Sequence, residues 1–157
     1  MDAADVHGPV DFVLVEFAGD RLTGRTAEAL LELVDAGIIA LYDVLVVGKR
    51  DDGSSYAVEL TDDAEVLGGF AQLDWVRSGL LTEDDVRTAA EAMEPGALAV
   101  LIVYENTWAV PFVAAARASG GEIVAVGRIP AQDVIDALDA SEGSAPAQPA
   151  PFMTAGA

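Results

Sequence analysis

The polar residues that could do chemistry gather at one junction, where an apolar stretch ends and a helical pattern begins. Glu105, Asn106, Thr107 and Trp108 stand there in succession. A carboxylate, an amide and an indole could together bind a small ligand, and open α/β sheets often bind ligands where a strand gives way to a helix. The same residues also have a structural explanation, because Asn106 or Thr107 could cap the helix and Trp108 could pack beneath its first turn.

Asp43 is a second candidate, because it interrupts an otherwise apolar predicted strand. An unpaired buried charge is costly, so Asp43 must pair with an arginine, reach the surface at a bulge or lie at an interface. Otherwise it is a candidate catalytic carboxylate. Arg128, near the end of the last predicted strand, could pair with Asp43, Glu16 or Glu105. A ligand-binding or enzymatic site would therefore use Glu105, Asn106, Trp108 and Arg128, together with Asp43.

The sequence lacks the residues that most other catalytic mechanisms require. His7 is the only histidine, and the chain has no cysteine, which argues against histidine relays and thiolate sites. Asp51 and Asp52 lack the alternating acids of a calcium loop, and Lys49 is followed by Arg50 where a P-loop requires Ser or Thr. We therefore expect no metal site and no cofactor.

Charge limits the partners that the protein could bind. The chain has 27 acidic and 8 basic residues, a formal net charge of -19, and the acids are spread along it. Such a surface repels phosphate backbones and anionic lipids, so we expect neither nucleic-acid nor membrane binding. The N-terminus resembles no secretory signal, and no window is apolar enough for a membrane span, which predicts a cytoplasmic protein.

Hydrophobic periodicity predicts a chain that alternates strands and helices. Pro111 suits the first turn of one helix, and Gly37 suits the end of another. The predicted strands cover residues 10–17, 38–49, 55–60, 97–104 and 122–128. The predicted helices begin near residues 23, 82, 111 and 130, with two shorter ones within residues 61–81.

Two strand-helix-strand units, over residues 10–47 and 97–126, share one plan. They predict an α+β, ferredoxin-like sandwich, with an added edge hairpin strand and with helices inserted between the units. A small doubly wound α/β sheet is the alternative. We expect one domain over residues 1–140 and a disordered tail, rich in Pro and Ala, over residues 141–157. Within that tail, Phe152 and Met153 could serve as a docking peptide.

Several predicted strands are apolar on both faces, so both faces of the sheet need a cover. Either the inserted helices or a second subunit could supply it, and we favour a homodimer that forms through the sheet. The leading functional hypothesis is a non-enzymatic interaction or regulatory module that self-associates and could also bind a protein partner. A small-ligand-binding protein or enzyme with its site at Glu105–Trp108 is the alternative.

Three segments together resemble an uncharacterised family of short, acidic bacterial proteins, which have a domain of unknown function. The segments are GPVDFVLVEF, LTEDDVRTAAEAMEPGALAVLIVYENTWAVPF and GRIPAQDVIDALDA, and the resemblance extends over residues 8–140. It implies a small cytoplasmic bacterial protein and transfers no catalytic residue. A distantly similar group has a glycine-rich apolar insertion for membranes, but the corresponding residues 61–81 are too polar here to span a bilayer.

Overall fold

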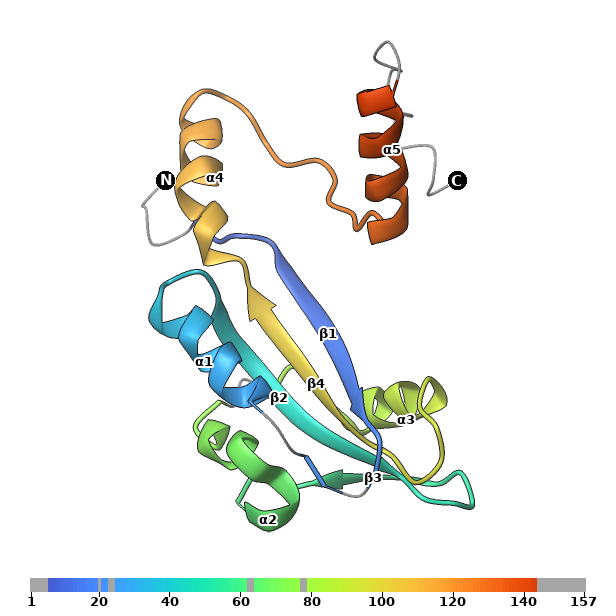
Figure 1. Cartoon of the computed structure of the whole chain (residues 1–157). Helices are drawn as coiled ribbons and strands as arrows, with labels where there is room; N and C mark the ends of the chain where they lie inside the picture. The colour runs from blue at the N-terminus through green and yellow to red at the C-terminus, as the bar shows by residue number, and fades with distance from the viewer. Residues whose placement is uncertain (1–5, 20, 23–24, 62–63, 77–78, 144–157) are drawn as a thin grey trace. The chain divides into compact units, whose positions relative to one another are not determined.

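The computed structural model describes residues 6–19, 21–22, 25–61, 64–76 and 79–143 (Figure 1). The chain divides into two compact units, Met1–Glu122 and Ile123–Ala157. The first unit contains a sheet and its covering helices. The second contains helix α5, Ala131–Gly143, and the segment that precedes it.

Most of the predicted elements are present. The strands are β1 (Val10–Phe17), β2 (Ala40–Lys49), β3 (Ser55–Val58) and β4 (Leu98–Glu105). The helices of the first unit are α1 (Thr26–Asp35), α2 (Ala64–Leu67), η2 (Gly68–Leu73), α3 (Glu83–Glu91), η3 (Thr107–Ala109) and α4 (Val110–Ala118).

The four strands form one antiparallel sheet in the order β1-β4-β2-β3. The α+β class is therefore confirmed, and an antiparallel sheet rules out the doubly wound alternative. Strand β4 lies between β1 and β2, the two strands that α1 connects. Element order up to β4 is strand, helix, strand, strand, helices, strand, so the hairpin strand β3 and the inserted helices form the second half of the fold rather than additions to it.

The predicted strand over residues 122–128 is wrong. Residues 121–130 have no regular secondary structure, and the second strand-helix-strand unit therefore lacks its last strand. A strand needs a neighbouring strand to satisfy its backbone groups. Both edges of β4 are already taken, by β1 and β2, so this segment has no place beside β4.

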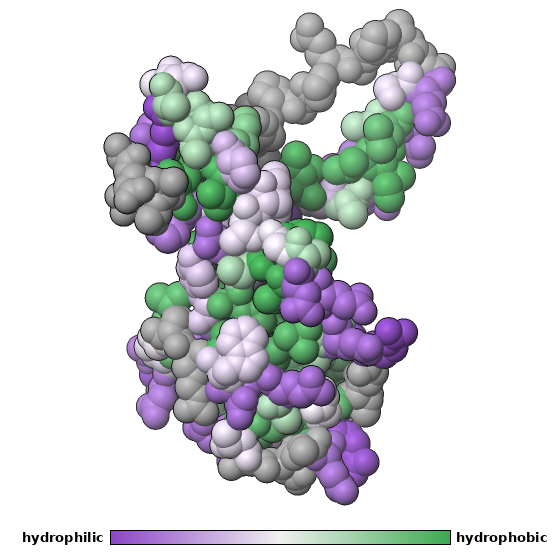
Figure 2. Space-filling model, turned by 90° about the vertical axis from the view of Figure 1, so that its left-hand side faces the viewer, coloured by the Kyte–Doolittle hydropathy of each residue, from purple (hydrophilic) through white to green (hydrophobic). Residues whose placement is uncertain are grey.

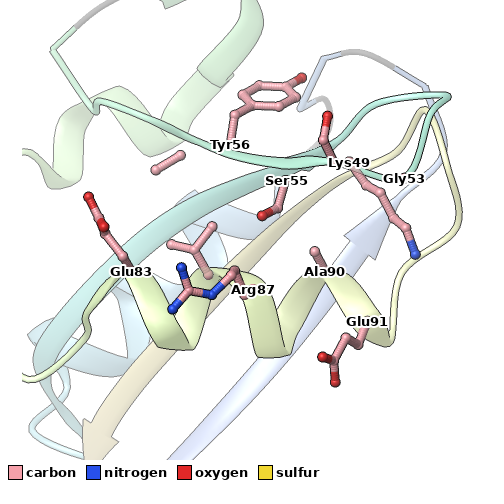
Figure 3. A pocket seen from close by; sticks show the side chains of 11 residues that line it. Lys49, Gly53, Ser55, Tyr56, Glu83, Arg87, Ala90 and Glu91 are labelled. Carbon is pink, nitrogen blue, oxygen red and sulfur yellow. The ribbon is translucent and has the colours of Figure 1, made fainter.

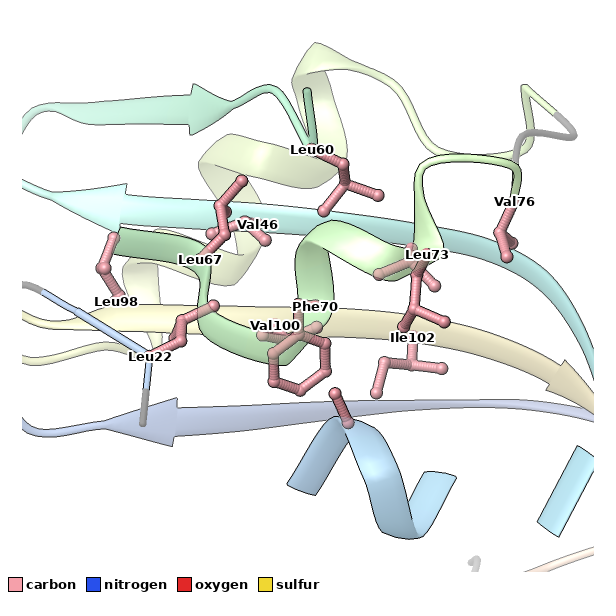
Figure 4. Close-up of a cluster of buried hydrophobic side chains, with 12 residues drawn as sticks. Leu22, Val46, Leu60, Leu67, Phe70, Leu73, Val76, Leu98, Val100 and Ile102 are labelled. Carbon is pink, nitrogen blue, oxygen red and sulfur yellow. The ribbon is translucent and has the colours of Figure 1, made fainter. Parts of the chain in front are cut away.

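One face of the sheet packs against α1, α2 and η2. Strands β2 and β4 contribute Val46, Leu98, Val100 and Ile102 to this core, and Phe70 and Leu73 enter it from η2 (Figure 4). Val46, Val100 and Leu73 are fully buried. The aromatic ring of Phe17 meets that of Phe70 edge to face, at 6.2 Å between centroids.

Helix α3 covers part of the opposite face. Val86, Ala89 and Ala90 of the helix, together with Met93 just after it, pack on Val47, Ala99 and Leu101. Asp85 fixes the start of the helix by accepting a hydrogen bond of 2.7 Å from the backbone N–H of Thr82. The inserted helices thus lie on both faces: α2 is on the same side of the sheet as α1, and α3 is on the other (Figure 1).

Coverage by helices is incomplete, and large hydrophobic side chains reach the surface. Phe12, Trp75, Trp108 and Phe112 are all exposed by 60% or more. On the side drawn in Figure 2, hydrophobic residues come to the surface in patches between hydrophilic ones. Among the residues that the structure describes, no helix is both long and apolar enough to cross a membrane.

Gly48 supplies a first test of this packing. Its backbone lies directly under the ring of Tyr56, where a Cβ atom would collide with the ring, and the guanidinium of Arg50 lies 4.6 Å from the centroid of the same ring. Gly48→Ala should therefore lower the free energy of unfolding by roughly 1–3 kcal/mol, as overpacking does, in urea titrations followed by circular dichroism. In a Tyr56→Ala background the same substitution should cost little. An equal cost in both backgrounds would contradict the packing of Tyr56 over Gly48.

Candidate functional site

Glu105 ends the central strand β4 and is a buried carboxylate, 6% exposed. Its Oε1 accepts a hydrogen bond of 2.6 Å from the hydroxyl of Tyr42, and its Oε2 accepts one of 2.8 Å from the backbone N–H of Gly8. The Nδ1 atom of His7 lies 3.9 Å from Oε1. Glu105 thus joins β2 and the N-terminal segment to the end of β4.

Local irregularities in the chain make these contacts possible. The register between β2 and β4 shifts between Leu41 and Asp43, so Tyr42 is the extra residue of a β-bulge. A bulge re-aims a side chain, and here the hydroxyl of Tyr42 reaches Glu105. Gly8 passes so close to the carbonyl oxygen of Asn106 that a Cβ atom would have no room.

The hydrogen bonds shift the pKa values of both side chains. Burial on its own would raise the pKa of Glu105, but the hydrogen bonds from Tyr42 and Gly8, with the nearby His7, outweigh it and lower that pKa below its ordinary 4.5. The hydrogen bond to Glu105, followed by burial, raises the pKa of Tyr42 above its ordinary 10.0. Glu105 is therefore ionised and Tyr42 protonated at neutral pH.

Asn106 does not cap the following helix, which has no side-chain cap. Its Nδ2 donates hydrogen bonds of 2.9 Å to the carbonyl oxygen of Pro9 and to Oδ2 of Asp11. The indole of Trp108 is 62% exposed and donates to Oδ1 of Asn106 at 3.2 Å, so it does not pack in the core. Thr107 donates to the carbonyl oxygen of Gly37 at 2.9 Å. Neither capping nor burial of the indole therefore explains this corner; its side chains hold the N-terminal segment and the turn after α1.

Asp43 lies next to the bulge, as one of the three expectations had it, but it is buried there and does not reach the surface. Its Oδ1 accepts a hydrogen bond from the N–H of Val44, and its Oδ2 accepts one from the N–H of Leu81, both at 3.0 Å. The side chain thus ties the segment before α3 to β2. Arg128 lies in the second unit, between α4 and α5, whereas Asp43 lies in the first.

These contacts show what the corner can do chemically. Both oxygens of Glu105 accept hydrogen bonds from the protein itself, as do both oxygens of Asp43. Two side chains of this corner are exposed: His7, 64% exposed beside Glu105, and Trp108, 62% exposed beside Asn106. Glu105 and Asp43 therefore act as structural anchors in this arrangement, and the exposed indole of Trp108 is available for stacking.

The structure adds an apolar groove of about 390 Å³ between β1 and α3, which the sequence did not predict. Val10, Phe12 and Leu14 form the wall on β1, and Ala89 and Ala92 form part of the wall on α3. Leu101 and Val103 of β4 line it as well, and Leu81, Asp11, Asp85 and Thr88 complete the lining. The alternating apolar residues of β1 and the alanines of α3 were the available signals, because alanines leave room beside a helix that larger side chains would fill.

A second cleft, of about 630 Å³, lies between the edge strand β3 and α3 (Figure 3). Lys49, Ser55, Arg87 and Glu83 line it, but the basic groups have partners already. The Nζ atom of Lys49 donates to the carbonyl oxygen of Met93 at 3.0 Å, and Arg87 pairs with Asp84. The charges of Lys49 and Arg87 are therefore not available together to bind one ligand.

The remaining candidates give no further site. Within the described part of the chain, no three His, Cys, Asp or Glu side chains gather in a way that could hold a metal ion. Phe152 and Met153, the predicted docking pair, lie outside the described residues.

The anchoring role of Glu105 predicts a pH-dependent loss of stability in Glu105→Gln. At pH 7 the neutral amide should lower the free energy of unfolding by roughly 1–3 kcal/mol, because a buried donor loses its charged acceptor. Since the folded pKa of Glu105 lies below the unfolded one, the carboxylate stabilises the fold above about pH 4.5 and loses this effect as the pH falls through its folded pKa. The difference between wild type and variant should shrink over that range in urea titrations. Glu59→Gln, at an exposed glutamate, is the control, and equal effects of the two substitutions would argue against the anchor.

Comparison with known proteins leaves the function open. A search of curated proteins found no match, and a search of solved structures found none. A family model does match residues 6–144, which takes in the sheet, its helices and α5. The chain belongs to this family, DUF6325, a family of unknown function.

Proposed function

We propose that the protein is a non-enzymatic interaction module that self-associates through the side of its sheet between β1 and α3. The observation that carries the proposal is the apolar groove there, with Phe12 at its rim, 70% exposed. An exposed apolar patch with a polar border is typical of a protein interaction site.

The groove exists because α3 covers only one end of its face. The strand register places Leu14 opposite Leu101 and Phe12 opposite Val103. Leu14 packs at the edge of the α3 cluster, whereas Phe12 lies beyond it. Val103 is still buried, so an apolar floor continues past the end of the covering helix. Covering one phenylalanine contributes on the order of 1.5–3 kcal/mol, enough to influence association.

The net negative charge of the chain limits where such an interface can form. Two copies with a net charge of -19 each repel one another, so they can meet only where acids are sparse. The groove meets this demand, because Asp11 and Asp85 are the only charged residues in its lining. Added salt should strengthen the association, since it screens the repulsion and leaves apolar contacts intact.

Phe12→Asp should abolish self-association, because a charge would then replace the exposed ring at the rim of the groove. Sedimentation velocity at micromolar concentration, in 50 mM and 500 mM NaCl, would measure the effect. Phe112→Asp is the matched control, since Phe112 on α4 is 69% exposed and lies outside the groove. It should leave the dimer intact.

A strict monomer for the wild-type protein at both salt concentrations would remove the proposal. Dissociation by Phe112→Asp with no effect of Phe12→Asp would move the interface to another surface.

One observation favours a second candidate, a small-ligand-binding protein. Trp108 is exposed beside Asn106 rather than buried, so its indole face is free to stack on a planar ligand. With Trp75→Phe in the background, Trp108 is the only tryptophan left, and its fluorescence should change as a ligand from a small-molecule library binds. An additional Asn106→Ala substitution should weaken any such signal; equal signals with and without Asn106 would argue against a site at this corner.

A further inference from the structure

The segment before α5 consists of residues that favour strands, yet it forms none. Ile123, Val124, Val126 and Ile129 are exposed, Val124 by 91%, within a stretch that has no regular secondary structure. Branched residues of this kind favour strands and seldom stay in contact with water together. The segment thus has the composition of a strand that lacks a neighbour.

Helix α5 directly follows, and it is amphipathic with its apolar side exposed. Ala131, Val134, Ile135 and Leu138 recur at helical spacing, and the three large ones are 43–58% exposed. Asp133 and Asp136 occupy the other side of the helix, and Asp139 flanks the stripe next to Ile135. Such a helix normally buries its apolar stripe against another surface.

In the part of the chain that the structure describes, strand β1 has an unpaired outer edge that could accept such a strand. It ends the described sheet and pairs with β4 alone, so the backbone groups along its outer edge have no strand beside them. The strand is eight residues long and mostly apolar, with Asp11 and Glu16 as its only charges. Long apolar edges of this kind readily accept another strand.

We propose that residues 123–143 of a second copy occupy this side of the sheet. Residues 123–128 pair as an added strand with the outer edge of β1, and the apolar stripe of α5 fills the groove between β1 and α3. This inference rests on the proposed self-association and names the element that makes it. One segment then covers both the open edge and the open face, which lie side by side on β1.

Size and charge agree with this arrangement. Six strand residues span about 20 Å, and the 13 residues of α5 span a similar length. Ile129 and Pro130 form a short link, and a strand with a short link to a helix suits a helix that packs back over the same sheet. Asp133 and Asp136 lie across the helix from its apolar stripe, so docking leaves them in solvent rather than against Asp85.

A two-fold pair makes each contact twice, since each copy donates its segment and accepts that of its partner. The buried surface of a single exchanged segment is thereby doubled. The added strand breaks no existing strand pair, because it lies outside β1 and leaves the β1-β4-β2-β3 order unchanged.

Disulfide trapping tests the proposal cleanly, because the chain has no cysteine of its own. Phe12→Cys and Leu138→Cys are prepared as separate full-length proteins, mixed, allowed to exchange subunits and oxidised mildly. A disulfide-linked heterodimer should be the main product of the mixture, and each variant alone should yield several-fold less linked dimer. Phe112→Cys mixed with Leu138→Cys is the matched control and should link poorly.

The outcomes separate this inference from the proposed function. Leu138→Asp should weaken dimerisation by about tenfold or more; a Leu138→Asp protein that stays dimeric would leave self-association standing and overturn the role of α5. A Phe12→Cys homodimer that links more readily than the Phe12→Cys and Leu138→Cys heterodimer would also overturn the role of α5. In that case the two grooves would face each other. A double variant that links within one chain as a monomer would assign the groove to the same chain's own segment and overturn the exchange.

Discussion

Strand β4 takes part in hydrogen-bonded pairs along both of its edges, with β1 on one side and β2 on the other. Six of its eight residues in succession, from Leu98 to Val103, are buried, which requires a cover on both faces. Everything else in the first unit follows from this demand. Helices α1, α2 and η2 cover one face, α3 covers part of the other, and the polar corner closes the end of the strand.

Glu105 illustrates how a buried charge can serve the fold instead of a reaction. A carboxylate at the end of a central strand costs free energy unless its oxygens are satisfied. The bulge at Tyr42 and the close approach of Gly8 supply two donors, so the charge that could have been catalytic holds two distant segments together. The same holds for Asp43, whose two backbone donors bridge β2 and the segment before α3.

The elements that the sequence predicts well are those whose own residues define them. Strand β1 and the helix starts at Thr82 and Pro111 have strong local patterns, and they are found where those patterns place them. The failure over residues 122–128 has a different origin. The residues favour a strand, but a strand forms only where it pairs with another, and both edges of the central strand β4 are occupied by β1 and β2.

The candidate site was predicted only in part, for a similar reason. The sequence identifies Glu105 and Asn106 as neighbours at a strand end, but not Tyr42 or Gly8, which reach them from 63 and 97 residues away. The groove between β1 and α3 depends on how far a helix extends over a sheet. No local pattern records that distance.

The pairing of the first strand with the last has a consequence for synthesis. Gly8 and Glu105 are separated by 97 residues, and β1 has β4 as its only partner strand in the described sheet. A ribosome must therefore complete about two thirds of the chain before β1 can be paired, which at 5–20 residues per second leaves an apolar strand unpaired for roughly 5–20 s. Long-range pairing of this kind also slows folding itself. During that interval the apolar strand is open to pairing with other chains.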